Sequence, residues 1–178
     1  PMLVWSMRGE QQARREDSFS SVTISGAISL LFAATLLPLP VPVVGATSHI
    51  CLTPVLALML GIRRILWPTF FVLLLQAVFF AHGGITTLGV NTLALGWLGP
   101  IVALGLWKLL QRMGAGQALA LGIACGMGGF SVYVADALVL AVALSDVATP
   151  SATFMGVLLG FAPIQLPLAC VEAFVSVT

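Results

Sequence analysis

Charged side chains are scarce in this sequence. Of its 178 residues, only 7% are Asp, Glu, Lys or Arg, whereas hydrophobic residues make up 60%, and the mean hydropathy is +1.12. A soluble domain carries about 25% charged residues, which it needs to build a water-facing surface. The shortage of charge therefore excludes an ordinary soluble protein and indicates an integral membrane protein.

Several motifs that carry chemistry are also missing. The net charge is +1 and there is no basic run, so a nucleic-acid partner is not expected. The sequence has no phosphate-binding G-x-x-x-x-G-K-[ST], no Ser/His/Asp arrangement and no pair of acids at matching depth, so we expect no enzyme activity and in particular no ATP hydrolysis. The three cysteines lie in separate apolar runs without C-x-x-C spacing, and packing is the simplest role for them: Cys51, Cys125 and Cys170.

Long apolar runs are what the sequence does contain. A spanning helix needs about 20 apolar residues, and by that measure one of the six runs is short, one is marginal and four are long enough. Prolines 38, 40 and 42 should end the first run irregularly. The fold class predicted is all-α, a polytopic transmembrane helical bundle of about six helices. The six runs are residues 22–44, 49–62 (short), 66–81 (marginal), 92–110, 118–144 and 154–177.

The two ends of the sequence look cut. Residues 1–7 are apolar but too few to span, so we expect them to be the tail of a truncated N-terminal helix whose beginning is absent. Residues 8–21 are then a cytoplasmic loop and residues 22–178 the helical bundle, which gives one transmembrane domain over residues 1–178. The last run stops at Thr178 without charged residues to close it.

The positions of the basic residues predict an orientation. Under alternating topology all seven fall on one side of the membrane, and the positive-inside rule makes that side the cytoplasm. The loops left for the outer side, residues 42–49, 82–91 and 145–153, contain no Lys or Arg. The seven residues are Arg8, Arg14, Arg15, Arg63, Arg64, Lys108 and Arg112.

Both histidines of the chain fall in these outer loops. His49 ends the segment "VVGATSH", and His82 begins the polar segment "HGGITTLGVN" between two apolar runs. Neutral imidazole is the commonest metal ligand among side chains, but two histidines are too few for a closed site. From spacing alone, a helix cap or a loop hydrogen bond explains each histidine more simply. Cys51 could add a sulfur ligand, although a packing thiol is simpler.

Two acidic residues lie inside apolar runs, where ionisable groups are costly unless they are paired or face a cavity. Asp136 is an intramembrane acid for which a structural hydrogen bond and a functional role remain equally open. Glu172 is most simply explained by the cytoplasmic interface. The G-x-x-x-G spacings at Gly122/Gly126 and at 156/160 indicate close helix packing.

In combination, four stretches resemble one known family. They are "VVGATSH", "LLLQAVFFAHGGITTLGVNTLALGWLGP", "VYVADALVLAVAL" and "FAPIQLPLACVEAFVSV". Together they are similar to the cobalt/nickel substrate-capture membrane subunit (S component) of energy-coupling-factor ABC transporters. The resemblance runs from about residue 20 to the end. It implies a subunit in the inner membrane of a prokaryote that captures Co(II) or Ni(II) on the outer side, with a transmembrane coupling subunit and ATPase subunits as partners.

The resemblance also implies roles for individual residues. The family's Gly-[Thr/Ser]-Ser-x-His motif falls on residues 45–49 and makes His49 the expected metal ligand. The 82–91 segment is similar to the loop that orders the ligands and closes the site. Under this interpretation Co(II) or Ni(II) is a transported substrate and no cofactor is bound permanently. The supporting residues implied are Thr47, Ser48, His82, Gly83, Gly84, Thr86, Thr87 and Asn91.

One departure from the family leaves two hypotheses open. Family members begin Met-His and use that terminus for further nitrogen ligands, whereas this sequence begins Pro1-Met2-Leu3. Either an upstream segment completes the site, or this homologue has lost its N-terminal metal ligands and is a structural or assembly subunit of a larger membrane complex. An unrelated small-molecule permease, with Asp136 facing its substrate, ranks third.

Overall fold

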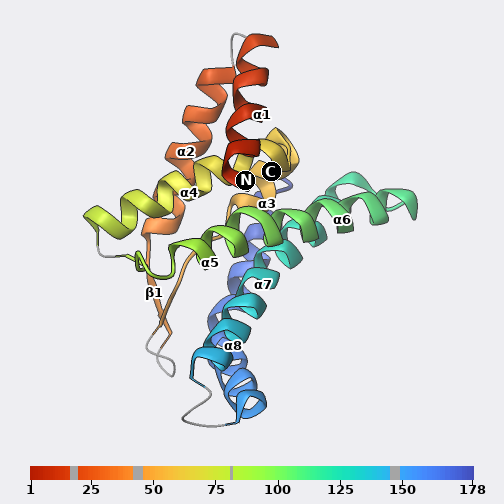
Figure 1. Ribbon diagram of the computed structural model, residues 1–178. Coiled ribbons are helices and arrows are strands. Elements are labelled where there is room, and N and C mark those ends of the chain that lie inside the picture. Colours follow the sequence, from red (N-terminus) through yellow and green to blue (C-terminus); the bar gives the residue numbers. More distant parts are fainter. Residues whose placement is uncertain (17–19, 42–45, 81, 145–148) are drawn as a thin grey trace.

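The computed structural model describes residues 1–178 except 17–19, 42–45, 81 and 145–148. Within the described residues the chain is almost entirely helical (Figure 1), which confirms the predicted all-α membrane bundle. The elements in chain order are α1 (Met2–Glu16), α2 (Ser20–Leu36), β1 (Leu39–Val41), β2 (Ala46–Ser48), α3 (Thr53–Leu60), α4 (Ile62–Phe79), α5 (Leu88–Leu93), the π-helix η1 (Ala94–Leu98), α6 (Gly99–Arg112), α7 (Gln117–Ala143) and α8 (Pro150–Val175).

Four helices of the described chain are long and apolar enough to cross a membrane: α4, the continuous α5–η1–α6 helix over 88–112, α7 and α8. Each of the six predicted runs contains a helix, but two are shorter than the sequence predicts. The run over 22–44 forms a 17-residue α2 that ends before Pro38, and the run over 49–62 forms the eight-residue α3. Proline at the start of α3 and Gly61, with φ of 85° at its end, confine α3 to two turns.

The N-terminal region differs from its prediction. Residues 8–16 are not a loop, because α1 continues through them to Glu16 and packs against α4. Glu10, in the charged half of α1, is only 4% exposed. Its carboxylate forms ion pairs with Arg14 and Arg64, at 2.9 Å each. The sequence predicted a cytoplasmic loop here, whereas Glu10 pairs with Arg14 within α1 and with Arg64 of α4.

A short antiparallel hairpin replaces the end of the first apolar run. Strand β1 pairs with β2 in the register Leu39↔Ser48, Pro40↔Thr47 and Val41↔Ala46. Both strands contact α8, and Figure 1 shows the hairpin extending from α2 along the lower part of the molecule. Prolines 38 and 40 follow the end of α2, and proline is unfavourable inside a helix because it lacks the N–H that the interior requires, although single prolines do occur within α4 and α8. The hairpin returns the chain to α7 and α8 directly before His49.

Helices α7 and α8 form the most extensive helix pair. Their close approach depends on small residues: a Cβ added to Gly126 would lie 2.9 Å from the carbonyl oxygen of Ala169. This confirms the packing interpretation of the Gly122/Gly126 spacing. A Cβ added to Gly156, in contrast, would meet nothing within 4 Å.

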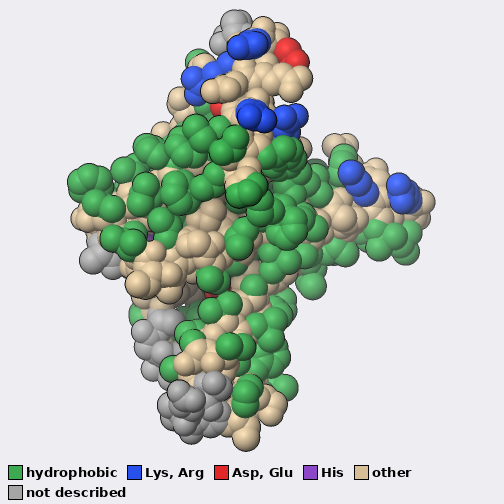
Figure 2. Space-filling model, in the orientation of Figure 1, with side chains coloured by type: hydrophobic (Ala, Val, Ile, Leu, Met, Phe, Trp, Pro, Cys, Tyr) green, Lys and Arg blue, Asp and Glu red, His purple; other side chains and the backbone are tan. Residues whose placement is uncertain are grey.

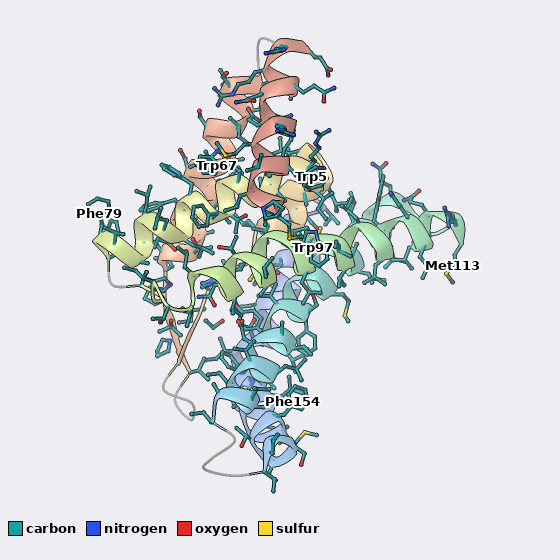
Figure 3. All side chains as sticks on the ribbon, viewed as in Figure 1. Trp5, Trp67, Phe79, Trp97, Met113 and Phe154 are labelled. Carbon is teal, nitrogen blue, oxygen red and sulfur yellow. The ribbon has the colours of Figure 1, made fainter. Side chains whose placement is uncertain are left out.

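The outer surface has the polarity of a membrane protein. In Figure 2 apolar side chains cover most of the visible face, and Lys and Arg gather over the α1–α2 end and the far end of α6. Phe79 and Met113, each 72% exposed, lie at the C-terminal ends of α4 and α6 (Figure 3). Large apolar side chains can stay exposed at this level because the surrounding solvent is lipid.

Candidate metal site

A cavity of about 440 Å³ lies where the end of the hairpin, the 82–91 segment and α7 meet. It brings together most of the residues that the sequence singled out, although they come from three separate parts of the chain. The cavity is lined by Thr47, His49, Leu73, His82, Gly83, Thr86, Thr87, Val90, Asn91, Leu95, Asp136, Val139, Leu140 and Phe161. Of the predicted site residues, Ser48 and Gly84 do not line it, and Gly45 of the ligand motif lies outside the described residues.

His49 follows strand β2 directly and faces the second histidine across the cavity. The ring centroids of His49 and His82 are 6.1 Å apart, with the ring planes tilted by 55°. The Nδ1 atom of His49 is buried and has no hydrogen-bond partner among the described residues. Burial, and in second place the neighbouring His82, lower the pKa of His49 to about 4. The ring is therefore neutral at pH 7, which is the state in which imidazole binds a metal.

Hydrogen bonds within the 82–91 segment satisfy the backbone N–H and carbonyl groups of Gly84. The hydroxyl of Thr87 accepts hydrogen bonds from the Gly84 N–H at 3.2 Å and from Asn91 Nδ2 at 3.3 Å, and it donates to the Gly84 carbonyl at 3.1 Å. Gly83 has φ of 69°, a backbone conformation that favours glycine. The segment thus forms a compact turn that leads into α5.

The first residue of that segment is tied to α4. The His82 N–H donates to the backbone carbonyl of Gln76 at 3.2 Å. His82 is consequently held at the end of α4 while its ring lines the cavity. The segment therefore satisfies part of its backbone locally and also forms one wall of the cavity.

Asp136 is the only acidic residue that lines the cavity among the described residues. It is half-buried and lies in the C-terminal third of α7. A carboxylate in this position gives the cavity a negative charge, which attracts a cation more strongly than it would in bulk water because the surroundings are apolar.

Three polar residues near the His49 segment were not singled out as site residues. They are Tyr133 on α7, and Gln165 and Glu172 on α8. Tyr133, 3% exposed, bonds the backbone of His49 through its hydroxyl. Gln165, 2% exposed, donates to the hydroxyl of Ser48. Glutamine and glutamate inside apolar helices are the available sequence signal, because buried polar groups need partners.

The structure gives Glu172 a different explanation from the cytoplasmic interface that the sequence favoured. It is enclosed by protein, since it is 2% exposed and its Oε1 accepts a hydrogen bond from the Cys51 N–H at 2.5 Å. Its partner lies 121 positions away in the sequence, so local composition does not reveal the contact. Cys51 itself is fully buried and does not line the cavity, which fits a packing role rather than a sulfur ligand.

The described residues contain no group of three His, Cys, Asp or Glu side chains placed to hold a metal ion. What the cavity offers is one neutral imidazole with an unpartnered nitrogen, a second imidazole nearby, one carboxylate and several hydroxyl or amide groups. This donor set suits a divalent transition metal that also keeps water or other nitrogen ligands.

Comparisons with known proteins agree with this arrangement. A family model described as the cobalt uptake substrate-specific transmembrane region matches residues 1–178. The cobalt transport protein CbiM of Sorangium cellulosum is 32% identical over 99% of this chain, and that of Moorella thermoacetica is 33% identical over 99%. The counterpart from Geobacter sulfurreducens is 30% identical over 97% of this chain. The chain spans 78%, 68% and 50% of the lengths of these three relatives, respectively.

Solved structures show the same fold. A crystal structure described as a truncated transition metal transporter superposes with a TM-score of 0.82, at 21% identity, over 99% of this chain and 85% of its own. A second transition metal transporter superposes with a TM-score of 0.80 at 19% identity. At these identities the likeness concerns the fold.

Proposed function

We propose, given that this chain belongs to the CbiM family of cobalt uptake transmembrane regions, that it captures Co(II) or Ni(II) in the cavity lined by His49. In this proposal it is the substrate-capture subunit of an energy-coupling-factor transporter. ATP hydrolysis and the coupling to release belong to other chains, namely the ATPase subunits and a transmembrane coupling subunit. The chain itself carries no nucleotide-binding motif.

The observation that carries the proposal is the state of His49. Its Nδ1 is buried and has no hydrogen-bond partner among the residues that the structure describes, at a cavity that also contains His82 and Asp136. A buried polar nitrogen without a partner is costly to the folded protein, and a bound metal would satisfy it. In this proposal the remaining ligands are water molecules or donor atoms of residues outside the described part of the chain. The family resemblance implies that a Met-His terminus supplies such donors.

The distribution of charge supports an orientation for uptake. All seven Lys and Arg lie in α1, at the start of α4 or at the end of α6. The cavity is formed instead by the opposite end of α4, the start of α5 and the hairpin. We propose that the basic end faces the cytoplasm and the cavity faces the outer side of a prokaryotic inner membrane.

Isothermal titration of the purified full-length protein with Co(II) and Ni(II) tests this function. The wild type is expected to bind one ion, and His49→Ala to lose at least about tenfold in affinity, as the loss of a ligand should cost no less than the loss of a supporting residue. Thr23→Ala, in α2 and away from the cavity, is the control that should bind like the wild type. If the correctly folded wild type binds neither ion, a structural or assembly role becomes the better account.

A further inference from the structure

Beneath the cavity, Tyr133 is bonded to both backbone groups of His49. Its hydroxyl donates to the His49 carbonyl at 2.5 Å and accepts from the His49 N–H at 3.2 Å. It also accepts from the hydroxyl of Ser48 at 3.1 Å. The thiol of Cys51 is a further, weaker donor to the same hydroxyl, with 3.6 Å between Sγ and the oxygen. Tyr133 therefore fixes the backbone on which the His49 ring is mounted.

Helix α8 holds the same stretch of chain at two further points. Gln165 Nε2 donates to Ser48 Oγ, and Glu172 Oε1 accepts from the Cys51 N–H at 2.5 Å. The bonded residues Ser48, His49 and Cys51 thus have partners on both α7 and α8. Gln165 and Glu172 are each 2% exposed, so little water competes for these bonds.

The imidazole of His49 makes no comparable hydrogen bond to α7 or α8 in the described part of the chain, where its Nδ1 has no hydrogen-bond partner. The direction of the ring must then be set by the backbone and by packing. We propose that Tyr133, Gln165 and Glu172 are positioning residues, which fix the His49 imidazole toward the cavity and so determine how tightly a divalent transition metal binds there. This inference rests on the proposed function for its metal readout, although the positioning itself can be measured without metal.

Within the described ranges, the hydrogen bonds of the Gln165 and Glu172 side chains go to the His49 segment and do not connect one helix to another. Gln165 and Glu172 do not bond to each other or to α7 in the hydrogen bonds of the described residues; their bonds go to the 48–51 stretch. Gln76 provides the contrast. It is equally buried, at 0% exposed, but its side chain joins α4 to Phe32 and Thr35 of α2, where it supports helix packing.

Supporting residues of this kind are valuable to a metal site because they set ligand orientation, and their loss typically costs about 10- to 100-fold in metal affinity. The same bonds also satisfy buried backbone groups of His49 and Cys51, which would cost stability if they were left without partners. A test of positioning must therefore separate a change in ligand orientation from a loss of stability.

The experiment compares four variants of the full-length protein. Tyr133→Phe removes the hydroxyl, and Glu172→Met removes the acceptor while keeping the length of the side chain. Glu172→Gln keeps an acceptor for the Cys51 N–H and is the conservative rescue. Gln76→Met is the matched control for loss of a buried polar group outside the segment.

We expect Tyr133→Phe and Glu172→Met each to weaken Co(II) binding by about tenfold or more, and to change the visible absorption spectrum of the bound Co(II). Glu172→Gln and Gln76→Met should bind within about threefold of the wild type. Equal losses in Gln76→Met, or unchanged binding in both Tyr133→Phe and Glu172→Met, would overturn the inference, since the first result indicates general destabilisation and the second no positioning role.

A metal-free readout separates this inference from the proposed function. If the wild type binds neither Co(II) nor Ni(II), the proposed function fails, and positioning is judged from the ring resonances of ¹³C-labelled His49. Tyr133→Phe should then shift or broaden these resonances while Gln76→Met leaves them in place. Unchanged resonances in Tyr133→Phe overturn the inference independently of metal binding.

Discussion

The carboxylate of Glu172 packs directly against the bare Cα of Gly129, in the space that a Cβ would occupy on any other residue. Gly129 lies on α7 and Glu172 on α8, and the same carboxylate bonds to the Cys51 N–H. The glycine therefore provides the space in which an acid from α8 reaches the segment that carries His49.

Replacing Gly129 with alanine should destabilise the protein. The new methyl group would overlap Glu172 Oε2, and overpacking of this kind costs about 1–3 kcal/mol. Thermal unfolding in detergent measures the effect. Gly105→Ala is the matched control, because a Cβ there meets nothing within 4 Å and alanine favours the helix.

The double variant Gly129→Ala/Glu172→Ala identifies the cause. Truncation of the acid removes the overlap, so the double variant should be more stable than the sum of the two single effects predicts. Strict additivity would show that the loss at Gly129 does not arise from contact with Glu172.

Glu10 should be important for the docking of α1. Glu10→Ala leaves Arg64 without its carboxylate partner. Breaking a fully buried ion pair costs about 3–5 kcal/mol; the side chain of Arg64 is 19% exposed, so we expect about 1–3 kcal/mol in unfolding experiments. Glu16→Ala, which removes an exposed acid bonded only to Gln12 in the described structure, should change stability by less than about 0.5 kcal/mol. Equal effects of the two substitutions would contradict the buried pairing.

Asp136→Asn should weaken cation binding without perturbing the fold. The substitution keeps the shape of the side chain and removes the negative charge from the cavity wall. We expect about a tenfold loss of Co(II) affinity, equivalent to about 1.4 kcal/mol, measured by titration calorimetry. Glu16→Gln changes the net charge by the same amount at the other end of the molecule and should have no effect. A loss in both variants would point to net charge rather than to the cavity.

His49 should remain neutral in mildly acidic solution. Because burial lowers its pKa to about 4, its ¹⁵N resonances in the metal-free protein should be those of a neutral ring at about pH 5.5, where a free histidine, with a pKa of about 6.5, is mostly protonated. The unfolded chain binds this proton and the folded chain does not, so lowering the pH from about 6.5 to 4 should reduce stability. A midpoint near 6.5 would show that the ring is not buried; His49→Asn assigns the signal.

The sequence was sufficient for the helical membrane bundle and for most of the cavity. Apolar runs predict helices because a lipid environment forces backbone hydrogen bonding within each segment. The polar 82–91 segment and His49 stand out because the sequence around them is apolar, and the structure places His49, His82 and Asp136 around one cavity. Their participation in metal binding stays a prediction.

The errors concern features that depend on tertiary contacts. The charges of α1 were interpreted as a loop because their pairing with Arg64, 54 positions after Glu10 in the sequence, is invisible in local composition. Glu172 was assigned to the interface because its depth was judged along its own helix, whereas its partner is the backbone of Cys51. Tyr133, the only tyrosine in the chain, was overlooked because backbone partners leave no sequence pattern.

The most direct test of the central claim is anomalous X-ray diffraction from crystals of the full-length protein grown with Co(II). The account predicts an anomalous peak in the cavity, at about 2.0–2.2 Å from a ring nitrogen of His49, the usual length of a bond from imidazole to a divalent metal. A peak at another site, or none in crystals that were grown in saturating Co(II), would contradict the assignment of this cavity as the metal site.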